Sequence, residues 1–195
     1  QVLALDSLPN TSFQRTRILI RVDGDDVIGL GHITRCVSIA EAFDRKRAKI
    51  TFLSASLSPS AQSHIQNAGF TIRMLQYQND QQNFVNEITK YAAQFHARKL
   101  ITDLPFNQSP EKNQAFIKLI KGLHARGISV AIIDGLDDDC ASMQVLLPAH
   151  VVIAPYLNAE HRRFLINSET KLLAGAQYFP FAKHFAKFDH KTKAV

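Results

Sequence analysis

Residues 18–43 constrain the fold more than any other part of the chain, because they combine a strand pattern, a glycine loop and a helix pattern. The first five residues, ILIRV, form a near-continuous apolar run, which is typical of a strand covered on both faces in a parallel sheet. From residue 33 to 43 the apolar side chains recur at helical spacing. This segment therefore predicts the first strand and helix of a βαβ unit.

The loop between this strand and helix contains Gly29, Gly31 and His32. Glycines let a ligand approach the backbone closely, and the positive end of a helix dipole favours an anion such as phosphate. The spacing G-x-G-H differs from the dinucleotide fingerprint G-x-G-x-x-G, so a dinucleotide site is disfavoured. We expect an anion-binding loop with His32 at its mouth. The plainer alternative is that the glycines only form a tight turn and that His32 caps the helix.

Strand and helix patterns alternate along the rest of the chain. Strands are expected at 49–53, 70–74, 99–103 and 128–134, and helices at 59–67, 84–95 and 109–123. Short apolar runs at 145–147 and 151–153 predict a last hairpin or edge pair, and residues 161–185 have a mixed pattern. The fold class is therefore α/β, with a doubly wound, Rossmann-like and mainly parallel sheet over residues 17–185. Residues 1–16 are expected to be a linker or cut edge, and residues 186–195 a basic tail.

In open α/β sheets ligands bind at the carboxyl ends of the strands, where three polar residues of this chain should meet. His32 follows the first strand, Asp103 ends the fourth and Asp134 ends the fifth. Each aspartate has a plainer alternative role as the cap of a helix or turn. The acidic run at 137–139 is expected to be a solvated turn, because consecutive residues rarely point at one metal ion.

Composition narrows the classes of partner. The formal net charge is +6, but four lysines between residues 183 and 193 against one aspartate supply half of it, so a nucleic-acid partner is not expected. No apolar run has the length needed to cross a bilayer. The two cysteines, Cys36 and Cys140, form no C-x-x-C pair or metal-ligand cluster, which indicates reduced thiols in a cytoplasmic protein.

The residues Arg21-Val-Asp23 and Ile28-Gly-Leu-Gly-His-Ile-Thr-Arg-Cys36 resemble the opening motif of a known family. These are the nucleotide-sugar hydrolases of pseudaminic acid biosynthesis, the UDP-diacetamido-trideoxy-altrose hydrolases. They are related to the spore-coat polysaccharide proteins and, more distantly, to glycosyltransferases of the two-lobed B type. Residues 100–103, 132–134 and 172–178 support the resemblance, which covers residues 18–185.

The resemblance implies that the chain is the N-terminal lobe of such an enzyme, with His32 and Asp23 as catalytic residues. It further implies a UDP-sugar substrate, no metal or other cofactor, and a C-terminal nucleotide-binding lobe as the missing partner. The residues assigned to the substrate are Arg21, Gly29, Gly31, Arg35, Asp103 and Asp134. One departure is that Asp103 is followed by Leu-Pro-Phe, where the family usually has a histidine and a tyrosine.

Histidine titrates near neutral pH, so it can activate a water for attack on an anomeric carbon that carries UDP as a good leaving group. Either Asp23 or Asp103 could orient His32. Three functions stay open: a hydrolase lobe, a glycosyltransferase lobe that uses another acceptor, and a sugar-nucleotide-binding domain without activity. The altered residues after Asp103 favour the third. The isolated chain is expected to have little activity of its own.

Overall fold

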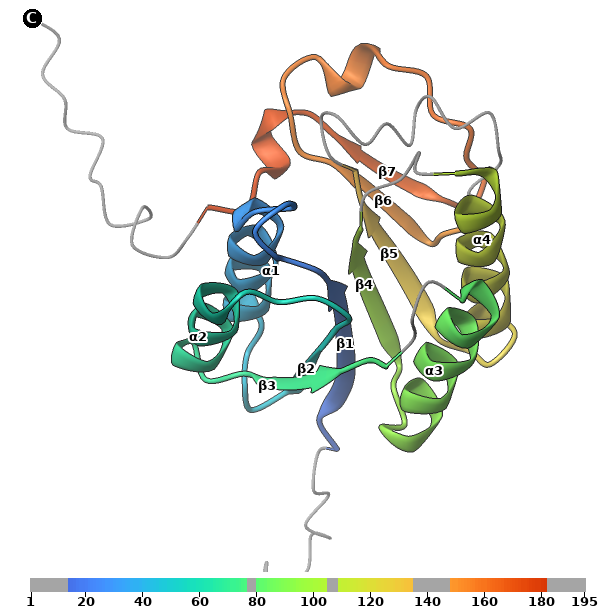
Figure 1. The fold of residues 1–195 in the computed structure, drawn as a ribbon. Helices are drawn as coiled ribbons and strands as arrows, with labels where there is room; N and C mark the ends of the chain where they lie inside the picture. The colour runs from blue at the N-terminus through green and yellow to red at the C-terminus, as the bar shows by residue number, and fades with distance from the viewer. Residues whose placement is uncertain (1–13, 77–79, 105–108, 135–147, 182–195) are drawn as a thin grey trace, which may run out of the picture.

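The structure is a computed structural model that describes residues 14–76, 80–104, 109–134 and 148–181, and it is an α/β fold built on one sheet (Figure 1). The sheet has seven strands in the order β3-β2-β1-β4-β5-β6-β7. Every neighbouring pair in it is parallel. The strands are β1 (Thr16–Val22), β2 (Ala48–Ser54), β3 (Thr71–Met74), β4 (Lys99–Asp103), β5 (Ser129–Ile133), β6 (Val151–Ala154) and β7 (Lys171–Ala174). The expected Rossmann-like, doubly wound architecture is therefore confirmed.

Helices cover both faces of the sheet (Figure 1). Helices α1 (Gly31–Ala42) and α2 (Pro59–Asn67) lie on one face, and α3 (Gln81–Gln94) and α4 (Pro110–His124) lie on the other. The side chains of Ser58, Asp80 and Ser109 accept hydrogen bonds from first-turn amides of α2, α3 and α4. These caps satisfy amides that a helix leaves without acceptors, so they fix where the three helices begin.

The chain reverses its direction of winding between β1 and β4. From β1 it moves outward through β2 to β3, and it then returns to pair β4 with the other side of β1. The switch point therefore lies between β1 and β4, and their carboxyl ends are at the top of the sheet in Figure 1. This switch point is where ligands bind in open α/β sheets.

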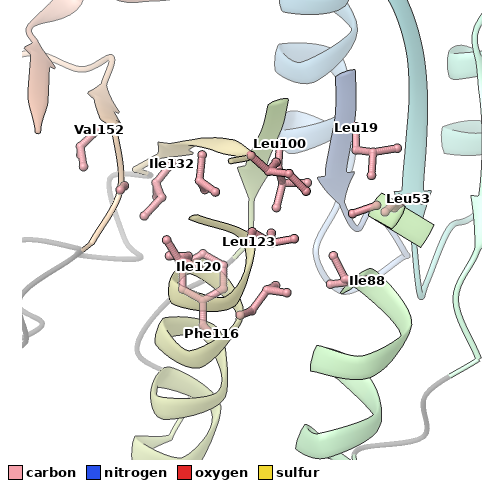
Figure 2. Packing of buried hydrophobic residues seen from close by; sticks show 14 of the residues in the cluster. Leu19, Leu53, Ile88, Leu100, Phe116, Ile120, Leu123, Ile132 and Val152 are labelled. Carbon is pink, nitrogen blue, oxygen red and sulfur yellow. The ribbon is translucent and has the colours of Figure 1, made fainter. Parts of the chain in front are cut away.

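Alternate residues of β1 enter different cores. Leu19 packs with the cluster that α3 and α4 cover, whereas Ile18 and Ile20 pack with the cluster under α1 and α2. Figure 2 shows the first cluster, in which Ile88 of α3 and Phe116 of α4 lie with apolar side chains of the central strands. Burial on both faces accounts for the near-continuous apolar run in β1.

The end of the sheet differs from the prediction. Residues 151–153 were expected to form a hairpin or edge pair, and this was wrong because β6 lies inside the sheet and pairs in parallel with β5 and β7. The edge strand β7 was not predicted, since its residues are exposed or half-buried and lack a clear apolar alternation. Thr16, which was placed in the linker, begins β1.

The predictions for the strand at 145–147, the acidic turn at 137–139, Cys140 and the tail at 186–195 lie outside the described residues. The same holds for residues 1–13 of the predicted linker. In the part of the chain that the structure describes, no helix combines the length and apolar character that crossing a membrane requires.

Candidate active site

His32 and Asp103 form a hydrogen-bonded pair at the carboxyl edge of the sheet. His32 lies in the first turn of α1, and its Nδ1 is 2.7 Å from Oδ1 of Asp103, the last residue of β4. Val22, the last residue of β1, is the register partner of Asp103. The pair therefore forms because β1 and β4 are neighbours and because α1 begins shortly after β1 ends. Asp103, and not Asp23, is the aspartate bonded to His32.

Arg35 holds the Asp103 carboxylate from the next turn of α1. Its Nε donates to Oδ2 at 2.8 Å, and its Nη2 donates to Oδ1 at 2.7 Å. The Cys36 thiol lies 3.6 Å from Oδ2 and donates to it. Burial and the Asp103 charge raise the pKa of the Cys36 thiol well above its usual range. Residues 32, 35 and 36 meet one carboxylate because positions three and four apart share a helix face.

Asp103 is ionised despite its burial. Its side chain is 1% exposed, and burial alone would raise its pKa. Hydrogen bonds from His32 and Arg35, with the Arg35 charge, outweigh burial and hold the pKa of Asp103 below its ordinary value. Arg35 Nη2, which can only donate, also lies 3.2 Å from His32 Nδ1. The shorter contact, 2.7 Å to a carboxylate that can only accept, favours the proton on Nδ1. Nε2 is then the ring nitrogen whose lone pair can take a proton.

Asp23 lies on the other side of the loop and joins it to β2. Its two oxygens each accept a hydrogen bond of 2.7 Å from Arg21, and Oδ1 also accepts from Ser54 Oγ and the Ala55 amide at 2.8 Å. Burial raises the pKa of Asp23, but the Arg21 charge and these hydrogen bonds lower it by more. These contacts are those of a structural ion pair, so a catalytic role for Asp23 stays a prediction.

Arg21 is 1% exposed and pairs with Asp23. This placement does not favour the prediction that Arg21 contacts substrate. Arg35, for which the same role was predicted, is half-buried and reaches Asp103. In the structure both arginines therefore orient aspartates.

The glycines of the loop have different roles. Gly29 has a φ of +78°, and its amide donates to the Asp25 backbone oxygen, so it forms a turn that a side chain would strain. A Cβ on Gly31 would meet open space. Gly24, which the sequence analysis missed, packs so closely on α1 that a Cβ would lie 2.3 Å from Cγ1 of Ile33. The sequence feature that could have identified Gly24 is its position directly after Asp23 and before the glycine motif.

Asp134 directly follows β5, the strand next to β4, but is held in a separate network. It is 0% exposed and accepts a hydrogen bond of 2.6 Å from the Tyr156 hydroxyl, which in turn accepts from Arg162 at 3.2 Å. Burial and the Asp134 carboxylate raise the pKa of Tyr156. Asp134 thus lies at the predicted edge, but its burial does not favour direct contact with substrate. Tyr156 follows β6, and the sequence analysis did not single it out.

Among the described residues, no three or more histidine, cysteine or acidic side chains are grouped so that they could hold a metal ion. What the arrangement can supply is a proton acceptor at His32 Nε2, with an anionic residue behind the ring and the amide end of α1 beside it. Such a couple of imidazole and carboxylate is suited to general base catalysis.

Comparison with known proteins leaves the family open. No family model matches the chain. No curated protein matches it. Among solved structures, the chain is similar to the crystal structure of Cj0485 dehydrogenase, with 11% identity and a TM-score of 0.33. The similarity covers 62% of this chain and 52% of the dehydrogenase, so the chain matches about half the length of that neighbour. At this TM-score the likeness has no bearing on function.

Proposed function

We propose that this chain is the histidine-bearing lobe of a nucleotide-sugar hydrolase that releases UDP from a diacetamido-trideoxy-hexose. The observation that supports the proposal most is the bond of 2.7 Å between His32 Nδ1 and Asp103, with Arg35 holding the carboxylate. The substrate class comes from the resemblance of residues 21–36 to the opening motif of that family.

His32 serves as the general base in this proposal. Its Nε2 takes a proton from a water while the water oxygen bonds to the anomeric carbon. The carbon–oxygen bond to UDP breaks through an oxocarbenium-like transition state, and UDP leaves with the electron pair. The proton on His32 then passes to solvent. Asp103 is a positioning residue, since its carboxylate fixes the tautomer of His32 and stabilises the imidazolium that forms.

The start of α1 is suited to the diphosphate of the leaving group. Among the residues that the structure describes, no side chain caps this helix, whereas serine or aspartate caps α2, α3 and α4. The backbone at Gly31 is open to a ligand, because no atom of the described residues outside its own helix turn lies within 4 Å of the position of a Cβ there. Amides at a helix start and the helix dipole favour phosphate, so the leaving group can be stabilised without a metal ion.

A second lobe is proposed to close over this edge. Large apolar side chains are exposed in the loops that follow the strands, among them Val27 at 95% and Phe181 at 67%, with Leu30, Leu157 and Phe179. Large apolar side chains that are exposed to this extent favour docking of another protein surface. The family that the chain resembles holds the nucleotide in such a lobe, so the isolated chain should bind UDP-sugars weakly.

The reaction is tested on the full-length protein that includes the proposed second lobe, with UDP-diacetamido-trideoxy-altrose in buffer without an acceptor. UDP release that falls by about 10²–10⁴ in His32→Ala is the expected loss for a general base. His64→Ala is the matched control and should keep the wild-type rate, because His64 lies exposed on α2. Release that requires an added acceptor would favour a glycosyltransferase, and binding without any release would favour a binding domain.

Calorimetry with UDP tests the need for a second lobe. Millimolar binding or none is expected for the isolated chain, since a millimolar Kd corresponds to only about −4 kcal/mol. Micromolar binding together with turnover by this chain alone would overturn the two-lobe proposal and indicate a self-sufficient small hydrolase.

A further inference from the structure

Cations from β1, from β2 and from the residue directly before β4 lie side by side at the amino edge of the sheet, opposite the candidate active site. Arg17 of β1 is the register partner of Lys49 of β2. On the other side of β1, Ile18 is the register partner of Lys99, so Arg17 and Arg98, which precede these two residues, lie next to each other. The Arg98 amide donates to the Arg17 backbone oxygen at 2.9 Å. Paired residues of neighbouring strands lie about 4.8 Å apart and point to the same face, so like charges there repel.

Arg17 and Arg98 of this row border a hollow of about 620 Å³, which is also lined by residues at the end of α3 and after α4. Its described lining residues include Arg15, Arg17, Arg98 and Arg126, together with His96. None of the described lining residues is acidic. The volume lies in the range of small-molecule sites, and four guanidinium groups without a carboxylate among them favour an anion.

Two of these arginines also form hydrogen bonds within the fold. Arg17 Nη1 donates to the backbone oxygen of Phe95 at 3.0 Å, and Arg126 Nη1 donates to that of Gly122 at 2.7 Å. Both acceptors lie at the carboxyl ends of helices, where cations are favoured. These bonds hold two of the guanidinium groups in place at the hollow. Each guanidinium has five N–H donors, so both retain donors for a further ligand.

His96 gives a second, independent observation. Helices α2, α3 and α4 end in the same way, with one residue of positive φ followed by an amide that bonds to a carbonyl five residues back. That residue is Gly69 after α2 and Gly127 after α4, but His96 after α3, with a φ of +50°. A side chain in this conformation costs free energy that glycine avoids. The strained residue is an exposed histidine that lines the hollow, which favours a role in binding.

We propose that this hollow binds a small anion that carries more than one phosphate group, with Arg98 and Arg126 as its main ligands and Arg15, Arg17 and His96 around it. One guanidinium group can donate two parallel hydrogen bonds to the oxygens of one phosphate. Several guanidinium groups in one hollow therefore favour an anion with several phosphate groups over a single phosphate. The site lies at the edge opposite His32, so it does not rest on the proposed hydrolase activity.

The test is calorimetry with inorganic pyrophosphate on three proteins: wild type, Arg98→Gln/Arg126→Gln and the control Arg73→Gln/Arg163→Gln. All four side chains are exposed, and both double variants lose two positive charges. Loss of charge-assisted hydrogen bonds should weaken binding at least tenfold in the first variant, and the control should change less than twofold.

Mapping of amide NMR shifts should place pyrophosphate at residues 15–17 and 96–98. No binding by the wild type at 10 mM pyrophosphate, a concentration on the order of a weak millimolar Kd, would overturn the proposal. An equal loss in both double variants would also overturn it, because net charge alone would then explain the affinity.

Discussion

Asp103→Asn replaces the carboxylate at the centre of the candidate site with an amide of nearly the same shape. Oδ1 accepts from His32 and Arg35, and Oδ2 accepts from Arg35 and Cys36. An amide has one accepting oxygen and one donating nitrogen, so either orientation places its NH₂ against an N–H of Arg35. The substitution thus breaks an ion pair in which Asp103 is 1% exposed and Arg35 16% exposed.

Removal of one partner from a buried ion pair costs about 3–5 kcal/mol, because it leaves the other charge without compensation. Arg35 retains some access to water, so the lower half of that range, about 3 kcal/mol, is expected here. The free energy of unfolding of a domain of ordinary stability is about 5–15 kcal/mol. Asp103→Asn should therefore remain folded at 25 °C, with a clearly lower urea midpoint.

Urea unfolding of wild type and Asp103→Asn at pH 7 and at low pH measures this free energy. The folded-state pKa of Asp103 is lowered. Its contribution is therefore complete above the unfolded-state pKa of about 3.9 and is lost as the pH falls below that value toward the folded-state pKa, by about 1.4 kcal/mol per pH unit. The difference between the two proteins should shrink accordingly between pH 4 and pH 3.

Asp26→Asn is the matched control for this experiment, because Asp26 is an exposed aspartate of the same loop region. It should change the unfolding free energy by less than about 0.5 kcal/mol. If Asp103→Asn is as stable as the control at pH 7, or if its deficit is the same at pH 7 and pH 3, Asp103 is not the ionised centre of the site.

Three further substitutions test the geometry by urea unfolding. Gly24→Ala should destabilise by about 1–3 kcal/mol through overpacking, because its Cβ would lie 2.3 Å from Ile33 Cγ1, whereas Gly31→Ala meets open space and should not; equal effects would contradict the described packing. His96→Gly should stabilise by about 0.5–1 kcal/mol, because it relieves a φ of +50°, whereas His64→Gly in the middle of α2 should destabilise; a loss in both would argue against strain at His96. Tyr156→Phe removes a hydrogen bond of 2.6 Å to buried Asp134 and should destabilise by about 1–3 kcal/mol, and an unchanged midpoint would contradict that bond.

The sequence was sufficient to predict which segments form strands and helices, and their succession along the chain, up to β5. Residues 18, 19, 20 and 22 are apolar because β1 is buried by two helix layers, and this near-continuous pattern indicates a parallel sheet. The edge strand β7 could not be found in the same way, since neither of its faces is fully covered and its side chains follow no clear alternation.

The sequence predicted the location of the site at the carboxyl edge of the sheet, but it did not predict which side chains bond to each other there. His32 and Asp103 could both be assigned to the carboxyl edge from strand and helix patterns. Which aspartate meets His32 depends on the order of strands in the sheet, and it is settled by the pairing of β1 with β4. The sequence contains no local signal for that order.

The basic hollow shows the same limit more strongly. Arg17, Lys49 and Arg98 are far apart in the chain, and the charge excess was attributed largely to the tail. They form a row only because of the register between β2, β1 and β4. Strand register depends on pairing across the whole sheet and is not visible in a local pattern.

The central claim, that Asp103 orients His32 so that Nε2 can accept a proton, is tested most directly by NMR of the chain labelled with ¹⁵N-histidine. At a pH where the ring is neutral, long-range ¹H–¹⁵N correlations report which nitrogen carries the proton. The account predicts the proton of His32 on Nδ1 in the wild type, with loss of this preference in Asp103→Asn and no change at His64. A proton on Nε2 of His32 in the wild type would contradict it.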